Sequence, residues 1–277
     1  MRWNWLLFAF ALVGASCTAP GQLSINTPQG RAQNYPPYIE DSPARRDAAQ
    51  EAWQAFLAEF RLPDTKIELE PILNTPRALP LELAGRIYLN ARGVAFDELE
   101  AKSVLRGFLG RAGGVLGGEG KDNPLNLNNL SLVNFSKEGN LYRVVYRQAG
   151  YTFPIENGYG ELRLMLGKDG ILLQWSSRLI PNVELPTTPV VTAKDLREKL
   201  VGKEFSYTTI AGQPQQYKVT DPTEITVRSL VVYPKLEGKR LTIHLAYPVE
   251  VGRSLTWTVY VDAINGQELG VRQNFAS

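Results

Sequence analysis

Hydrophobic residues first recur at helical spacing shortly after residue 40. They form one apolar stripe made of Ala49, Ala52, Trp53, Phe56, Leu57 and Phe60. Ser42 suits the N-cap of such a helix, Pro43 suits its first position, and Pro63 stops it. The spacing predicts a helix whose aromatic stripe lies in the core. We expect two short extended segments, 66–73 and 86–90, to follow it.

A second helical pattern begins at Asp97. Asp97 and Glu100 have the spacing of a capping box, and four residues then line one helical face: Ala101, Val104, Leu105 and Phe108. The pair Gly113-Gly114 predicts the end of this helix.

The pattern then changes to alternation at every second residue. Two runs alternate in this way, over residues 141–147 and 161–167, and a further strand is expected over 171–179. The turn at Lys168–Gly170 joins the last two as a hairpin. Alternation with one polar face predicts an antiparallel sheet with one face in solvent.

The order of helix and strands repeats towards the C-terminus. Thr192 and Asp195 predict a capped helix that ends at Gly202. Strand patterns follow over 223–233, 240–250 and 254–262, with a last one from about Gln267 after the Asn265-Gly266 turn. The chain is therefore predicted to be α+β, with two tandem units in which a helix packs on a curved antiparallel sheet.

The first residues have the pattern of an export signal. Arg2 precedes a short apolar run over residues 5–13, which is too short to span a membrane because a span needs about 20 residues. Gly14, Ala15 and Ser16 then lead directly to Cys17, a pattern that resembles the lipobox of bacterial lipoproteins. The resemblance implies lipidation of Cys17, with palmitate-type acyl chains, although leucine is usual where Gly14 stands. The alternative is ordinary signal cleavage with Cys17 incidental.

Composition excludes several kinds of chemistry. A formal net charge of +2 gives no reason to expect a nucleic-acid partner. One cysteine and one histidine, His244, exclude both a thiolate cluster and the paired histidines of a zincin. Alternation places His244 on the solvent face of its strand. We expect no catalytic residue, no metal and no cofactor.

The C-terminal two thirds of the chain resemble a known pair of domains. The stretch 142–179 is similar to the fungalysin/thermolysin propeptide (FTP) domain, whose strand pair ends in a Lys-Asp-Gly hairpin. Residues 190–270 are similar to the PepSY domain, with its Tyr-Val-Asp-Ala-x-x-Gly ending at 260–266. The resemblance implies cystatin-like units. The architecture is also similar to YycI-type extracytoplasmic regulatory proteins, which restrain a membrane sensor kinase.

These patterns predict five segments. They are a signal peptide over residues 1–16, a tether over 17–41, an N-terminal helix with short strands over 42–94, an FTP-like unit over 95–186 and a PepSY-like unit over 187–277.

The resemblance implies a non-enzymatic protein, lipid-anchored on the extracytoplasmic side of the cell envelope. It would bind a peptide or protein partner, as a propeptide-like inhibitor or folding helper of a secreted peptidase supplied by a separate chain. The alternatives are a YycI-type regulator of a sensor kinase, or an enzyme that needs neither paired histidines nor cysteine. Tyr151, Phe153 and Tyr159 are predicted partner-binding residues, because aromatic side chains in a Gly- and Pro-containing segment suit a recognition surface.

Overall fold

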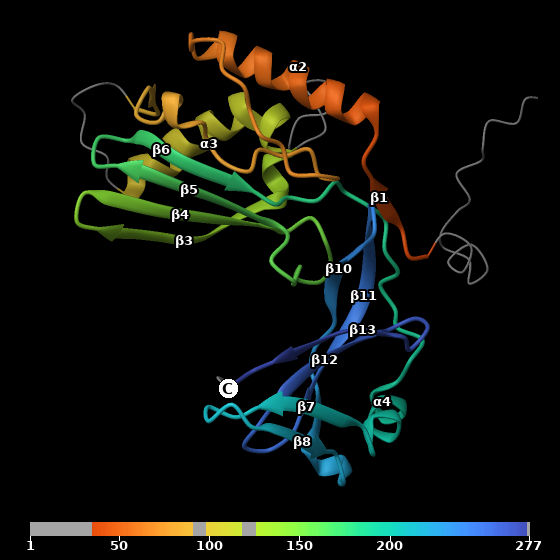
Figure 1. Ribbon diagram of the computed structural model, residues 1–277. Helices are drawn as coiled ribbons and strands as arrows, with labels where there is room; N and C mark the ends of the chain where they lie inside the picture. Colours follow the sequence, from red (N-terminus) through yellow and green to blue (C-terminus); the bar gives the residue numbers. More distant parts are fainter. Residues whose placement is uncertain (1–34, 91–97, 118–125, 276–277) are drawn as a thin grey trace, which may run out of the picture. The chain divides into compact units, whose positions relative to one another are not determined.

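The computed structural model describes residues 35–90, 98–117 and 126–275. All of the described helices and strands belong to the unit Pro36–Ser277. This unit consists of helices and curved antiparallel sheets, which confirms the predicted α+β class (Figure 1).

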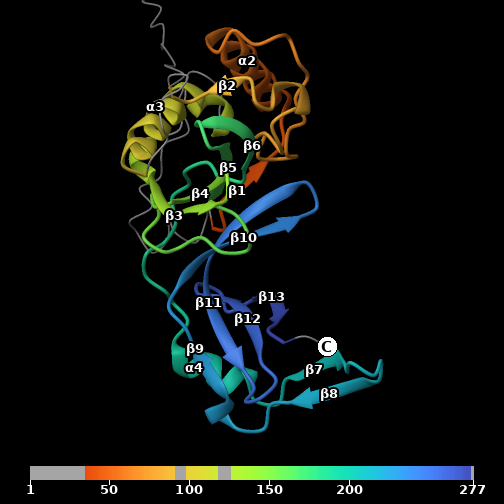
Figure 2. The same cartoon turned by 90° about the vertical axis from the view of Figure 1, so that its left-hand side faces the viewer.

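The first sheet has five antiparallel strands in the order β2-β6-β5-β4-β3. Their bounds are β2 Ile87–Tyr88, β3 Leu130–Glu138, β4 Leu141–Gln148, β5 Glu161–Gly167 and β6 Ile171–Ser177. Two helices, α2 (Pro43–Glu59) and α3 (Glu98–Leu116), cover the same face of this sheet, as Figure 2 also shows. The predicted alternation explains the layering, because Leu162, Leu164 and Leu166 of β5 are all buried beneath the helices.

Aromatic rings form the centre of this layer. The ring centroids of Trp53 and Phe56 on α2 lie 5.3 Å apart, and Phe56 lies 5.1 Å from Trp175 on β6. Phe108 of α3 packs 6.1 Å from the same Trp175 ring. The prediction that the aromatic stripe of the first helix lies in the core is confirmed.

Helix α3 continues past the glycines that were predicted to end it. It runs to Leu116, and the Gly117 N–H still donates to the Gly113 carbonyl at 3.0 Å. Each glycine costs a helix about 1 kcal/mol relative to alanine. Val115 and Leu116 are buried beyond the glycines, and burial of two such side chains outweighs that cost.

Strand β3 was not predicted. It pairs with β4 over its whole length, but its register shifts between Leu132 and Asn134. Such a bulge inserts an unpaired residue, here Val133, and so breaks the alternation that predicts a strand. β3 lies at the edge of the sheet.

The second sheet has six strands. Four follow the order β1-β11-β12-β13, and β9 and β10 each pair with β11 as well. Their bounds are β1 Tyr38–Glu40, β9 Ile225–Val227, β10 Val231–Glu237, β11 Arg240–Val251, β12 Trp257–Asp262 and β13 Glu268–Gln273. Residues 38–40, placed in the predicted tether, thus form a strand of this sheet.

The remaining elements all precede β9 along the chain. They are α4 (Ala193–Leu200), the unpredicted hairpin of β7 (Glu204–Thr208) and β8 (Pro214–Lys218), and the 3₁₀ turns η1 (Leu81–Leu83), η2 (Leu127–Asn129) and η3 (Pro222–Glu224). The capping box of α4 is confirmed: Thr192 Oγ1 accepts from the Asp195 N–H at 3.2 Å, and Asp195 Oδ2 accepts from the Thr192 N–H at 3.0 Å. Among the described residues, no helix is long and apolar enough to cross a membrane.

Candidate functional site

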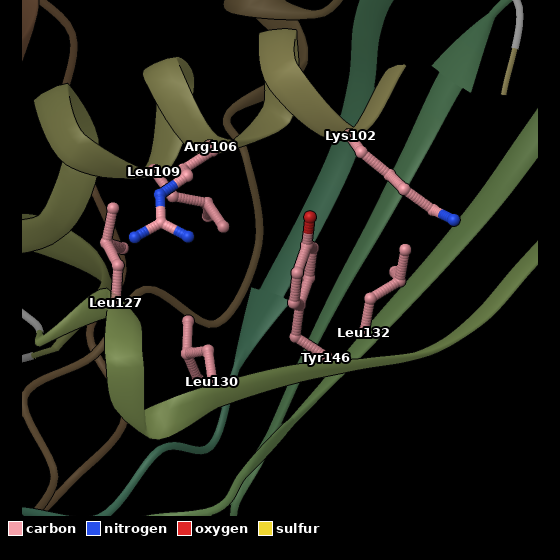
Figure 3. Close-up of a pocket in the computed structure, with 7 residues that line it drawn as sticks. All are labelled: Lys102, Arg106, Leu109, Leu127, Leu130, Leu132 and Tyr146. Atoms are coloured by element: carbon pink, nitrogen blue, oxygen red, sulfur yellow. The ribbon is translucent and has the colours of Figure 1, made fainter. Parts of the chain in front are cut away.

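A groove of about 300 Å³ lies between helix α3 and the edge strand β3 (Figure 3). Three elements besides β3 contribute to it: α3, the turn η2 and strand β4. Its lining residues are Lys102, Arg106, Leu109, Leu127, Leu130, Leu132 and Tyr146. Its size is at the lower end of the range for ligand-binding pockets, which is about 300–1,000 Å³.

The local sequence explains why these side chains meet. Lys102, Arg106 and Leu109 are spaced by four and three residues, so they share one face of α3. Leu130 and Leu132 are two residues apart on β3 and therefore point to the same side of the sheet. The alternation continues onto β4, where Tyr146 is paired with Leu132.

The groove has an apolar floor and a cationic rim. Lys102 and Arg106 are at the rim, and the Arg106 guanidinium donates to Asn128 Oδ1 at 3.3 Å. None of the described lining residues carries a carboxylate. The groove therefore combines leucine side chains with two positive charges.

Tyr146 adds a hydroxyl to the groove. Its side chain is only 7% exposed, and the hydroxyl points from β4 towards α3, between Arg106 and Lys102 (Figure 3). Burial raises the pKa of Tyr146 above its ordinary value, so the phenol stays protonated and can donate. No described residue hydrogen-bonds to this hydroxyl.

The sequence patterns did not single out Lys102, Arg106 or Tyr146. The available signal was the spacing of Lys102 and Arg106, which puts two cations one turn apart on a helix beside its apolar stripe. Tyr146 gave no such signal, because a tyrosine on the apolar face of a strand is typical of an ordinary core.

The predicted partner-binding aromatics lie in a different place. Tyr151, Phe153 and Tyr159 are half-buried and pack against an apolar cluster that includes Val232 and Ile243 of the second sheet. The structure brings the three rings together in this cluster, and it does not place them at the groove.

Two of these rings have polar contacts as well. The Tyr151 hydroxyl donates to the Pro181 carbonyl at 2.8 Å and accepts from the Val183 N–H at 3.2 Å. The Arg178 guanidinium lies 4.2 Å from the centre of the Tyr159 ring. The rings thus have structural contacts of their own, and their role in partner binding stays a prediction.

His244 is buried, which corrects the prediction that it lies on a solvent face. It is 3% exposed, with Nδ1 2.7 Å from Asp262 Oδ2 and Nε2 3.0 Å from Thr242 Oγ1. The prediction failed because β11 is an interior strand with both faces covered: Ile243 packs in one cluster and Ala246 in another. The Thr242 hydroxyl donates to the Lys235 carbonyl, so this buried network holds strands together.

Cys17, the predicted lipidation site, lies outside the described residues. Among the residues that are described, no three His, Cys, Asp or Glu side chains are grouped to hold a metal ion.

Comparisons with known proteins give only distant structural similarity. No protein-family model matches the chain, and no curated protein matches it. Among solved structures, the chain is similar to the Bacillus megaterium YpeB C-terminal domain, with a TM-score of 0.31 and 11% sequence identity. The match covers 86% of this chain and 100% of the other. The resemblance to the FTP and PepSY domains stays a prediction.

Proposed function

We propose that this is an exported, lipid-anchored and non-enzymatic protein that binds an extended peptide segment of a protein partner. Following the domain resemblance, the partner would be a secreted peptidase, which the protein inhibits or helps to fold. The anchor at Cys17 would hold the protein on the extracytoplasmic side of the cell envelope. The alternative partner is the outer domain of a membrane sensor kinase.

The observation that carries this proposal is the position of the groove beside an open strand edge. β3 is nine residues long and pairs with β4 on one side only, within the described chain. A strand added to its other edge gains backbone hydrogen bonds, and every second side chain then faces the groove. Val133, at the bulge of this edge, is 47% exposed and gives the incoming strand an apolar contact.

Other long edges suit a partner less well. The outer edge of β10 is already used, because Val232 exchanges backbone hydrogen bonds with Pro154 and Glu156. β13 is an edge strand of six residues, and the groove does not adjoin it. β13 therefore provides a matched control for β3.

A photo-crosslinking side chain at Val133, in intact cells of the source organism, tests the proposal. Val271 on β13 is the control, because it is the same residue type on an edge strand and is 46% exposed. We expect position 133 to yield one dominant extracytoplasmic adduct that position 271 does not yield. Equal adducts at both positions, or none at either, would overturn strand addition at β3.

The identity of the adduct then separates the two partner classes. A secreted metallopeptidase supports the propeptide-like function, and purified protein is then expected to change its activity or its yield on refolding. A sensor kinase supports the regulatory function instead. Substitution Val133→Asp is expected to weaken either interaction, whereas Val271→Asp is expected to leave it unchanged, since a charge on an edge strand disfavours pairing.

A further inference from the structure

The chemistry of the groove narrows the class of peptide that it accepts. We propose that the groove binds an acidic side chain of the incoming strand, with Lys102, Arg106 and the Tyr146 hydroxyl around its carboxylate. This inference rests on the proposed function, since it names the ligand of the same site. The partner segment is then an extended peptide in which an Asp or Glu alternates with apolar residues.

The charges of the groove supply the first argument. Lys102 and Arg106 stand one turn apart on the face of α3 that lines the groove. Arg106 donates one hydrogen bond to Asn128. Its guanidinium has five N–H donors, so others can bond to a ligand. None of the described lining residues carries a negative charge, and the two cations complement a carboxylate of the partner.

The hydroxyl of Tyr146 supplies a second, independent argument. A ligand group that enters a polar groove gains affinity when it accepts the hydrogen bonds that water would otherwise accept. The Tyr146 side chain is only 7% exposed, its hydroxyl points into the groove, and no described residue accepts from it. A ligand oxygen placed between Arg106 and Lys102 would accept a hydrogen bond from this hydroxyl.

The apolar floor explains why the ligand is a peptide strand and not a free anion. Leu130 and Leu132 lie on β3 itself, on the groove side of the strand. A strand paired with β3 directs its alternate side chains along this row, about 7 Å apart. An acidic side chain near the rim thus has apolar neighbours two residues away, which Leu109 and Leu127 are placed to contact.

Three pools of random nonapeptides test this inference on the full-length protein in detergent micelles. The pools are identical except for a central Glu, Gln or Lys, with Leu fixed two residues to either side. We expect the protein to retain the Glu pool about tenfold better than the Lys pool, the size of effect expected for one charge-assisted hydrogen bond. The preference is expected to fall when the salt concentration rises.

Two sets of variants locate the preference. The double variant Lys102→Gln with Arg106→Gln is expected to abolish it. Arg111→Gln is the control, because it removes the same charge from the same helix but pairs with Glu59 outside the groove. Tyr146→Phe is expected to reduce retention of the Glu pool without lowering the melting temperature, since it removes only the hydroxyl.

The outcomes distinguish this inference from the proposal on which it rests. Equal retention of all three pools, weakened by Val133→Asp, would leave strand addition standing and overturn the acidic preference. Retention of none would overturn both. If sodium dodecanoate binds with the same dependence on Arg106 while no peptide pool is retained, the groove takes a lipid carboxylate and the peptide inference is wrong.

Discussion

His244 Nδ1 lies 2.7 Å from Oδ2 of Asp262, and both side chains are buried within the second sheet. The pair joins β11 to the end of β12. The other carboxylate oxygen, Oδ1, accepts from the backbone N–H groups of Ile264 and Asn265 at 2.8 and 3.1 Å. Asp262 therefore holds both the histidine and the turn that leads to β13.

We expect Asp262→Ala to lower the free energy of unfolding by about 3–5 kcal/mol, because it leaves buried donors without an acceptor. Urea denaturation measures this, with Asp47→Ala as the control. Asp47 lies on α2, away from this network, and a surface change of this kind is expected to stay within about 0.5 kcal/mol. A cost below about 1 kcal/mol for Asp262→Ala would show that the network contributes little.

The contacts of Tyr151 and Phe153 predict a structural effect for their substitution. Tyr151→Phe keeps the ring and removes two hydrogen bonds, so we expect a cost of about 1–2 kcal/mol. Phe153→Ala removes a ring that packs on an apolar cluster, at about 2 kcal/mol or more. Both costs are measured by urea denaturation of the purified variants. If neither variant loses stability but partner binding falls, these rings serve recognition.

Glu161 accepts from Arg147 Nε at 3.1 Å and from Arg163 Nη2 at 2.6 Å. Burial raises the pKa of Glu161, but the hydrogen bonds and charges of Arg163 and Arg147 outweigh it, so the net pKa is lower than usual. A carboxyl with a lowered pKa in the folded state stabilises the fold above its unfolded pKa of about 4.3. This stabilisation is lost as the pH falls through the folded-state pKa.

Glu161→Gln is therefore expected to cost about 1 kcal/mol near pH 7, where the exposed arginines keep the gain small. The difference from the wild-type protein is expected to shrink as the pH falls below the unfolded-state pKa of about 4.3. Denaturation curves over this pH range measure it. A difference that stays constant with pH would mean that charge plays no part.

The proposed lipid anchor at Cys17 has its own test. We expect Cys17→Ser to abolish fatty-acid labelling and to leave the protein either unprocessed or released from the membrane, because no other cysteine offers a thiol for acylation. Labelling of cells followed by membrane fractionation measures both effects. Unchanged labelling and retention would show that the protein is attached in another way.

Patterns along the chain were sufficient to predict the α+β class and most of the local elements. Local signals are enough for this: the capping box of α4 and the hairpin turn before β6 involve only near neighbours along the chain. Where a local sequence signal and tertiary packing favoured different structures, the structure followed the packing. The helix end expected at Gly113 moved to Leu116 because the residues beyond it are buried on the sheet.

The residues that line the groove could not be predicted from patterns along the chain. Lys102 and Leu130 are far apart in the sequence, and no periodicity shows that a helix face and a bulged edge strand meet. The burial of His244 was likewise decided by the tertiary structure, because alternation assigns a residue to one face of a strand but does not reveal whether that face is covered. Coverage depends on long-range contacts, and these determine both the polar network inside the second sheet and the ligand chemistry proposed for the first.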